Sequence, residues 1–130
     1  MGETWEKVAS WVSCHTGKNT FHFLKGKVVL EATTSDGFST SYLRENKHKT
    51  FFGFAGVLGC SDFFDYSLKE RSSFDAVISN PPWDEHFLKV FYQYLLFLQK
   101  PFVLILRAGS SKHHLFQKTF GAGSYRTIIP

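Results

Sequence analysis

Residues 74 to 83 read F-D-A-V-I-S-N-P-P-W, an apolar run that stops at an asparagine, two prolines and a tryptophan. The run 74–79 is short and mostly apolar, which is typical of a buried strand. Each proline fixes φ and has no backbone N–H, so the strand has to end where the prolines begin. We therefore expect Asn80 at the carboxyl end of a buried strand, followed by a rigid turn.

The segment after this turn has the periodicity of a helix. Apolar residues in 84–100 recur at i, i+3, i+4 and i+7, and Asp84 and Glu85 stand at the end where the helix dipole favours anions. Pro101 ends this helix, and F-V-L-I-L over 102–106 predicts the next strand. Strand, helix and strand in this order indicate parallel strands joined by a helical crossover.

The same alternation covers the rest of the chain. We expect helices over 5–13, 39–45 and 112–119, strands over 28–31 and 50–58, a strand end or turn over 61–66, and the start of a strand over 125–130. This order predicts an α/β fold, a doubly wound parallel sheet with helices on both faces. No repeat or linker divides the sequence, so we expect a single domain over 1–130, with an N-terminal helix and lead-in over 1–24 and a core over 25–130.

The composition is that of a folding chain. Hydrophobic residues make up 43% of it, which excludes the intrinsically disordered class. The two cysteines, Cys14 and Cys60, are too few for a disulfide framework. No apolar run reaches the roughly 20 residues that span a bilayer. We expect a soluble intracellular protein, cytoplasmic or nuclear, with no membrane partner.

The charge is unevenly distributed. The net charge is +4, but residues 86–130 contain six Lys/Arg, three His and no carboxylate. Such a segment is either an electrostatic footprint for a polyanion or an ordinary solvated surface, and both interpretations stay open.

The turn after the strand 74–79 offers a specific chemistry. Ligands of parallel sheets gather at the carboxyl ends of the strands, which is where Asn80 is expected. The Asn80 side-chain oxygen and the Pro81 carbonyl can accept both hydrogens of an exocyclic NH2 group, and Trp83 can stack on the ring that carries it. With both hydrogens engaged, the nitrogen lone pair is directed at an electrophile. This arrangement suits methyl transfer to an amino nitrogen.

The same residues resemble a known family. F-D-A-V-I-S-N-P-P-W is similar to the (N/D/S)-P-P-(Y/F/W) motif that ends the fourth strand of S-adenosylmethionine-dependent amino-methyltransferases of class I. That family includes DNA and RNA adenine methyltransferases and the glutamine methyltransferases of release factors. The resemblance, which extends loosely over 20–130, implies a Rossmann-like sheet, S-adenosylmethionine as cofactor and catalytic roles for Asn80, Pro81, Pro82 and Trp83.

The resemblance also implies residues for the cofactor. V-V-L-E-A-T-T-S-D-G over 28–37 looks like the family's cofactor loop, with Glu31 as the acid after the first strand and Asp36 and Gly37 inside the loop. S-D-F-F-D over 61–65 looks like the stretch that faces the adenine, where Asp62 would accept a hydrogen bond and Phe63 would pack on the ring.

Two departures accompany these matches. Ser35 replaces the first glycine of the loop, and F-F-G-F-A-G-V over 51–57 lacks the acid that ends the family's second strand and binds the ribose. The family sheet also continues past a segment such as 125–130, so the chain is expected either to be truncated at its C-terminus or to depend on a partner, a second subunit or a second copy.

Three functions therefore stay open. The first is N-methylation of adenine in DNA or RNA, with nucleic acid as partner and the basic segment 86–130 on its phosphates. The second is a non-catalytic methyltransferase-like subunit or remnant without cofactor binding, and the third is methylation of a protein glutamine. No metal is expected, because the adjacent His113 and His114 point apart on a helix and have no third ligand at a suitable spacing.

Overall fold

The computed structural model describes Trp5, Lys7 and residues 21–32, 38–48, 52–60, 62–82, 84–107, 109–110 and 113–121. Most of the helix expected over 5–13 and the strand expected over 125–130 lie outside these residues, as do Cys14, Ser35, Asp36, Gly37 and Trp83. Trp5 and Lys7 themselves are helical.

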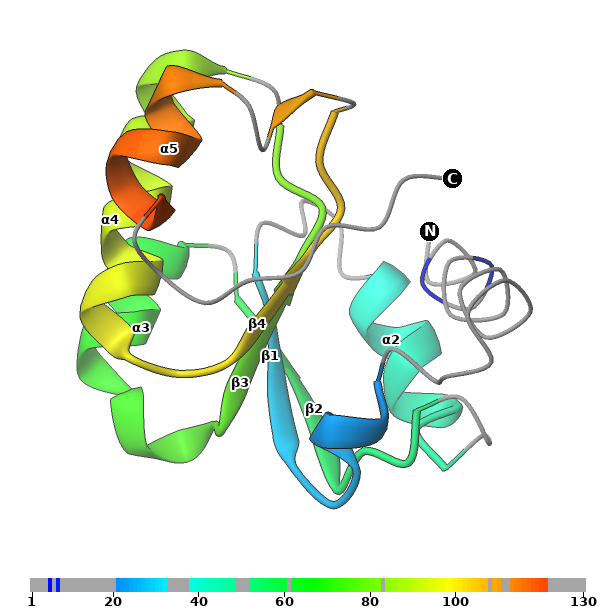
Figure 1. The fold of residues 1–130 in the computed structure, drawn as a ribbon. Helices are drawn as coiled ribbons and strands as arrows, with labels where there is room; N and C mark the ends of the chain where they lie inside the picture. The colour runs from blue at the N-terminus through cyan, green and yellow to red at the C-terminus, as the bar shows by residue number, and fades with distance from the viewer. Residues whose placement is uncertain are drawn as a thin grey trace.

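The described core is a four-stranded, wholly parallel sheet in the order β2-β1-β3-β4 (Figure 1). The strands are β1 (Val28–Ala32), β2 (Gly56–Gly59), β3 (Ala76–Ser79) and β4 (Phe102–Leu104). The helices are α2 (Phe38–Glu45), α3 (Phe63–Lys69), α4 (Glu85–Leu98) and α5 (His114–Phe120), with short 3-10 turns at η1 (His22–Leu24) and η2 (Arg71–Ser73). This is the expected α/β class, and at this coarse level it fits a Rossmann-like fold.

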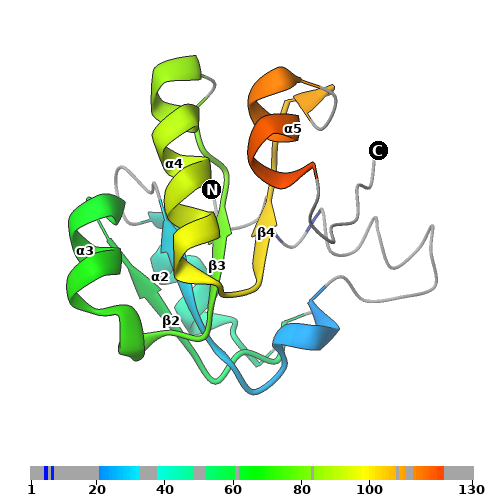
Figure 2. The same cartoon turned by 60° about the vertical axis from the view of Figure 1, so that its left-hand side comes forward.

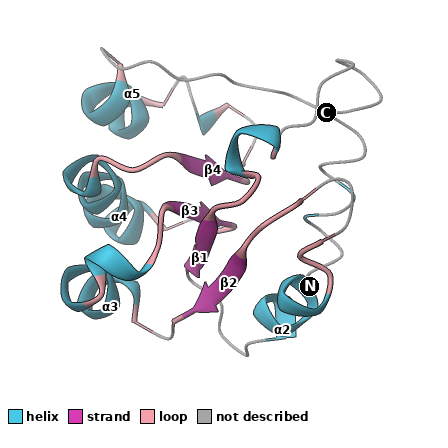
Figure 3. Cartoon of the chain, turned by 90° about the horizontal axis from the view of Figure 1, so that it is seen from below, coloured by secondary structure: helices cyan, strands magenta, loops and turns pink. Residues whose placement is uncertain are grey.

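Helices cover both faces of the sheet. Figure 3 shows α2 on one side and α3, α4 and α5 side by side on the other, and Figure 2 shows the same three helices in front of the strands. Alternate residues of each strand face opposite layers. Val29 and Ile78 join a core with Leu43 of α2, whereas Leu30 and Val77 join a core with the opposite helices. The doubly wound arrangement expected from the sequence is confirmed.

The elements differ from the sequence expectation mainly between residues 50 and 70. The second strand is only Gly56–Gly59, because a turn occupies the residues before it and Gly53 has a left-handed φ of 63°. The expectation of a strand end or turn over 61–66 is wrong. Asp62 caps a helix there, and Phe63 and Ser67, one turn apart, form its buried face.

The direction of the chain connections reverses between β1 and β3. From β1 the chain passes through α2 to β2 on one side, and from β3 it passes through α4 to β4 on the other side. Such a reversal opens a crevice at the carboxyl ends of the two central strands, where ligands of doubly wound sheets bind. The fold thus indicates the ends of β1 and β3 as the place to look for a site.

Candidate functional site at the carboxyl edge of the sheet

The ends of β1 and β3 are held next to each other. Ala32 pairs with Ser79 in the register of the two strands, and the Ser79 hydroxyl donates a hydrogen bond to the Ala32 carbonyl at 3.2 Å. Ser79 also accepts at its carbonyl from the Ile105 N–H at 2.9 Å, beyond the end of β4. The residue after Ser79 is Asn80, so the asparagine starts its turn directly beside the end of β1.

The proline turn itself is open to solvent. Asn80 and Pro82 are exposed and Pro81 is half-buried. The Asp84 N–H donates to the Pro82 carbonyl at 3.1 Å, and the Asp84 carboxylate accepts from the N–H groups of His86 and Phe87. Because this cap fixes the start of α4, the turn is anchored at both ends. The exposed Asn80 amide is thus held on a rigid support, as a positioning group requires.

Glu31 lies at the same edge but is turned inward. The residue is 3% exposed, and its carboxylate accepts hydrogen bonds from Trp5 Nε1 at 2.8 Å, Ser39 Oγ at 2.6 Å and Thr40 Oγ1 at 2.7 Å. Both carboxylate oxygens therefore have protein donors. These bonds join β1 to the start of α2 and to the N-terminal segment, so the protein itself holds the acid that the resemblance assigns to the cofactor.

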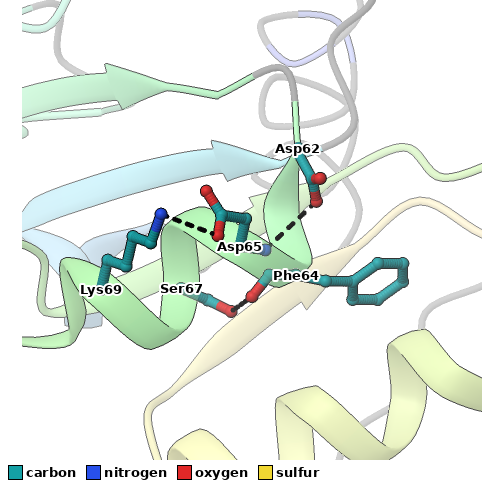
Figure 4. Close-up of polar contacts among 5 residues, drawn as sticks. All are labelled: Asp62, Phe64, Asp65, Ser67 and Lys69. Atoms are coloured by element: carbon teal, nitrogen blue, oxygen red, sulfur yellow. Dashed lines mark hydrogen bonds and ion pairs between the residues drawn. The ribbon is translucent and has the colours of Figure 1, made fainter.

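Asp62 and Phe63 have different surroundings, although they are adjacent in the sequence. Asp62 is exposed and caps α3 by accepting from the Asp65 N–H at 3.1 Å (Figure 4). Phe63 is 4% exposed, and its ring packs edge-on against the Phe91 ring with a centroid separation of 5.0 Å. The carboxylate of Asp62 can meet a ligand, whereas the Phe63 ring contributes to the hydrophobic core.

The shorter β2 changes which acid stands at the end of the second strand. With the strand at Gly56–Gly59, the chain reaches Asp62 only three residues beyond it. The strand expected over 50–58 starts later and ends one residue later than expected, and the stretch 51–57 that lacks an acid lies mostly before it. Asp62, which the resemblance assigns to the adenine, is thus also the first acid after the end of β2.

A pocket of about 270 Å³ lies at this end of β2. It is lined by Gly59, Cys60, Asp62, Asp65 and Tyr66. Burial raises the pKa of Tyr66, and Glu70 and Cys60 raise it further, so its hydroxyl is protonated and can donate. Ligand sites commonly measure about 300–1,000 Å³, so this pocket lies just below that range and can enclose only part of a ligand. Its carboxylates suit the hydroxyl and amino groups of such a ligand.

Sequence reasoning missed several residues of this edge. Asp65 and Tyr66 are not in the expected site, because the sequence predicts a strand end or turn over 61–66 and the structure has the start of α3 there. The signal was the pair Asp62 and Asp65, since an aspartate three residues before a second acid is a common N-cap pattern. Ser39 and Thr40, which bind Glu31, carried no signal of that kind.

The ends of β2, β1 and β3 are adjacent, so the structure lines up Asp62, Glu31 and Asn80 along one edge of the sheet. Asp62 is exposed beside the pocket, whereas Glu31 is buried and already has three protein donors. The expected Asp36, Gly37 and Trp83 lie outside the described residues.

Comparisons with protein-family models, curated proteins and solved structures gave no match to this chain. Within the described part of the chain no helix is long and apolar enough to cross a bilayer. The described residues also contain no group of three or more His, Cys, Asp or Glu side chains that could hold a metal ion. His113, one of the two histidines considered for a metal, caps α5 instead, because its Nδ1 accepts from the Leu115 N–H at 3.3 Å.

The basic segment contributes unequally to the surface. Lys89, Arg107 and Lys118 are exposed. Lys100 is half-buried and donates from Nζ to the carbonyls of Arg71 and Phe74. Arg107 follows β4 at the same edge as Asn80. Arg107 is thus a described, exposed cation that follows a strand at this edge of the sheet.

Proposed function

We propose that the chain is an S-adenosylmethionine-dependent methyltransferase that acts on an exocyclic amine, with adenine N6 in DNA or RNA as its substrate. One observation carries the proposal: an exposed Asn-Pro-Pro turn begins at the carboxyl end of β3, beside the end of β1, where the chain connections reverse. The resemblance of 74–83 to the amino-methyltransferase motif supplies the chemistry for this position.

In this proposal the chain's own residues hold the amine. The Asn80 side-chain oxygen and the Pro81 carbonyl accept its two N–H hydrogens and stabilise the positive charge that develops on nitrogen. Trp83 stacks on the base, which has to leave its duplex or come from a single strand. When bound, the cofactor supplies a methyl group on sulfonium. That methyl group would pass to the nitrogen held by Asn80 and Pro81, and the methylated amine would lose one proton to water.

Asp62 and the pocket beside it are the proposed place for the nucleoside part of the cofactor. The exposed carboxylate can accept from ribose hydroxyls, and Gly59 and Cys60 at the end of β2 form the adjoining wall of the pocket. Arg107 is the proposed contact to a phosphate of the substrate strand.

The test is methyl transfer from tritiated S-adenosylmethionine to single-stranded oligonucleotides that contain or lack adenine. We expect label only in the adenine-containing strands and a loss of roughly 100-fold in kcat for Asn80→Ala, the order of magnitude for removing one transition-state acceptor or donor. Gln93→Ala removes a carboxamide from the exposed face of α4 and should leave the rate unchanged. Equal rates for Asn80→Ala and the wild-type chain would refute the role of the turn.

A specific observation also favours the second candidate, a methyltransferase-like subunit that does not bind the cofactor. Glu31 is 3% exposed and both of its carboxylate oxygens already accept from protein donors, so a ligand would have to compete with the protein for it. Titration calorimetry with S-adenosylmethionine separates the two functions. Binding that is weakened by Asp62→Ala supports the enzyme, whereas no heat and no thermal stabilisation support the subunit. A glutamine-containing peptide assayed in parallel tests the third function, and label transferred to it instead of to adenine would exclude the nucleic-acid substrate.

A further inference from the structure

Positive charge gathers where η1, the end of α2 and the starts of β1 and β2 come together, at the lower end of the view in Figure 1. The sequence there, 21–28 and 44–56, contains five Lys/Arg and a single carboxylate, Glu45. Four of these cations belong to the described residues, namely Lys25, Lys27, Arg44 and Lys47. We call these four residues the amino-edge patch, because the parallel strands begin at this edge of the sheet.

Backbone hydrogen bonds hold the two parts of the patch together. The Ala55 N–H donates to the Lys27 carbonyl at 2.8 Å, and the Phe54 N–H donates to the Lys47 carbonyl at 2.8 Å. Because Phe54 and Ala55 are neighbours in the chain, the turn before β1 and the segment after α2 lie side by side. Arg44 belongs to the last turn of α2 and so lies at the same end of the molecule.

The four cations are available to a ligand. Lys25, Lys27 and Arg44 are exposed, and Lys47 is half-buried. None of them pairs with a carboxylate of the described residues. Arg44 Nε donates to the Val57 carbonyl at 3.1 Å, which orients the guanidinium and leaves its two terminal nitrogens for an anion.

The positive surplus persists when the neighbouring carboxylates are counted. Glu45 is exposed on α2, and Asp75 accepts from the Val28 N–H at 2.8 Å beside the start of β1. Toward β3 and β4 the same edge adds two cations and one carboxylate, namely Arg71, Lys100 and Glu70. The described amino edge therefore holds twice as many Lys/Arg as carboxylates.

The opposite edge of the sheet, where the adenine is proposed to bind, is acidic. Asp62, Asp84 and Glu85 are exposed there, and Arg107 is an exposed cation at the same edge. These carboxylates repel phosphates, so a substrate strand gains little electrostatic attraction at that edge. Attraction for its phosphates has to come from another surface, and the amino-edge patch supplies unpaired cations for it.

Phe23 adds an aromatic ring to this surface. It is 51% exposed on η1, two residues before Lys25. Bases of a single strand stack on exposed rings while nearby Lys and Arg hold the phosphates. We propose that the amino-edge patch and Phe23 bind single-stranded nucleic acid, several nucleotides away from the adenine to be methylated. The choice of ligand rests on the proposed function, to which the patch adds a second contact with the substrate strand.

Two other polyanions match this surface less well. An acidic peptide pairs with the cations, but the negative face of the Phe23 ring suits a base rather than a carboxylate. An anionic membrane takes up several apolar side chains at once, whereas Phe23 is the one large exposed hydrophobic residue among the described residues of 21–28 and 44–56. Cations beside a single exposed ring fit a nucleic acid.

The bound strand has to be long enough to reach both ends of the sheet. β1 has five residues, and at about 3.3 Å per residue it separates the amino edge from the carboxyl edge by roughly 16 Å. A stacked strand rises about 3.4 Å per nucleotide, so roughly five nucleotides cover this distance. The patch should therefore act on long substrates only.

The first test is fluorescence anisotropy of a labelled single strand of about 20 nucleotides, roughly 70 Å when stacked, titrated with the full chain. We expect Lys25→Glu/Lys27→Glu to weaken binding about tenfold and to reduce the steepness of log Kd against log salt by about 1.4, the value for two lost phosphate contacts. Phe23→Leu should weaken binding about fivefold, the lower limit for loss of base stacking. Lys89→Glu/Lys118→Glu makes the same change in net charge on exposed residues of α4 and α5, and its binding should stay within about twofold of the wild type.

The second test is methyl transfer to the same strand and to a strand of about three nucleotides, roughly 10 Å long. Lys25→Glu/Lys27→Glu should raise the KM for the long strand about tenfold with kcat unchanged, and should leave the KM for the short strand unchanged. A loss of folding would instead lower kcat for both strands. Patch-dependent binding without methyl transfer would refute the proposed function and leave the patch as a nucleic-acid site.

Several results would overturn the inference. These are no binding of the long strand, equal binding by the wild-type and Lys25→Glu/Lys27→Glu chains, or an equal loss in the Lys89→Glu/Lys118→Glu control. Polyglutamate that displaces the strand at equal charge, with Phe23→Leu behaving as the wild type, would assign the patch to an acidic protein. Binding to phosphatidylserine vesicles that depends on Lys25 and Lys27, without binding of the strand, would assign it to a membrane.

Discussion

Glu31 shows how one side chain can belong to a candidate site and to the folding core at once. Its buried carboxylate has donors from Trp5, Ser39 and Thr40. Glu31→Gln keeps the size but replaces one acceptor oxygen with a donor that faces other donors. We expect the free energy of unfolding to fall by about 1–3 kcal/mol, the cost of an unsatisfied buried group, in urea titrations followed by circular dichroism. Glu45→Gln changes an exposed carboxylate on α2 and should have no measurable effect. An unchanged midpoint for Glu31→Gln would contradict the bond assignment.

Tyr92 predicts a pH dependence at the alkaline end. It is 2% exposed, and burial raises its pKa above the ordinary value of 10.0. The unfolded chain therefore ionises this tyrosine first, so its contribution to stability is complete below pH 10 and is lost as the pH rises through the raised pKa. Urea midpoints can be measured from roughly pH 8 to 11, a range that includes the ordinary tyrosine pKa of about 10. Over this range the midpoint should fall more for the wild-type chain than for Tyr92→Phe. Parallel curves would contradict the prediction, since Tyr66, whose pKa is also raised, titrates in both proteins.

For single residues, the sequence predicts those positions that depend only on the covalent geometry of neighbouring residues. Two prolines force a strand to end, so the position of Asn80 at the carboxyl edge followed from its neighbours alone. The surroundings of Glu31 did not follow, because one of its donors, Trp5, lies 26 residues away in the chain. The burial of Phe63 likewise depends on Phe91, which belongs to another helix.

Among the elements, β2 and α2 approach so closely that one glycine is required between them. A Cβ at Gly59 would lie 2.8 Å from Thr40 Oγ1, the atom that donates to Glu31. Gly59→Ala should therefore displace Thr40 and lower stability by about 1–3 kcal/mol, the usual cost of overpacking. Gly56→Ala is the matched control in the same strand, because its Cβ would meet Val28 at an ordinary 3.6 Å. Equal melting temperatures for the two variants would show that Thr40 yields without cost.

Long elements were predictable and short ones were not. The helix expected over 84–100 is α4 at Glu85–Leu98, because fourteen residues repeat the apolar spacing often enough to exclude a strand. The seven residues of α3 make up fewer than two helical turns, so the helical spacing of apolar residues is not evident. Aromatic residues are common in α3, and such residues favour strands. The strand expected over 50–58 is only Gly56–Gly59 in the structure. Phe52 and Phe54 are buried, as strand residues often are, but they do not belong to the sheet.

For the molecule as a whole, one sheet separates two hydrophobic cores. Ile78 belongs to the core on the α2 side and Leu30 to the core under α3, α4 and α5. Because both residues sit in paired central strands, we expect the two cores to unfold together. Ile78→Val should cost about 0.5–1.5 kcal/mol and Leu30→Ala about 2–5 kcal/mol, each as a shift of one transition seen alike by near- and far-ultraviolet circular dichroism. Two separated transitions in either variant would contradict a single cooperative unit.

The class of the whole fold was predictable because strand and helix patterns alternate along the chain, and only parallel sheets join strands in that way. The order β2-β1-β3-β4 was not, since the apolar pattern of a strand does not state which neighbour it pairs with. Yet that order brings Asp62, Glu31 and Asn80 to one edge. The candidate residues could be proposed from the sequence, but their alignment required the pairing.

The bonds of Glu31 also suggest a sequence of events in folding. Ser39 and Thr40 are eight and nine residues from the carboxylate, whereas Trp5 is 26 residues away. Short chain loops close at lower entropic cost, so the strand and its following helix can join before the first residues of the chain return to them. The Trp5 indole would then form its hydrogen bond to Glu31 after β1 and α2 have come together. Removal of the Trp5 indole should leave the folding rate nearly unchanged and accelerate unfolding. The lifetime of the folded edge of the sheet would then depend on the hydrogen bond from Trp5 to Glu31.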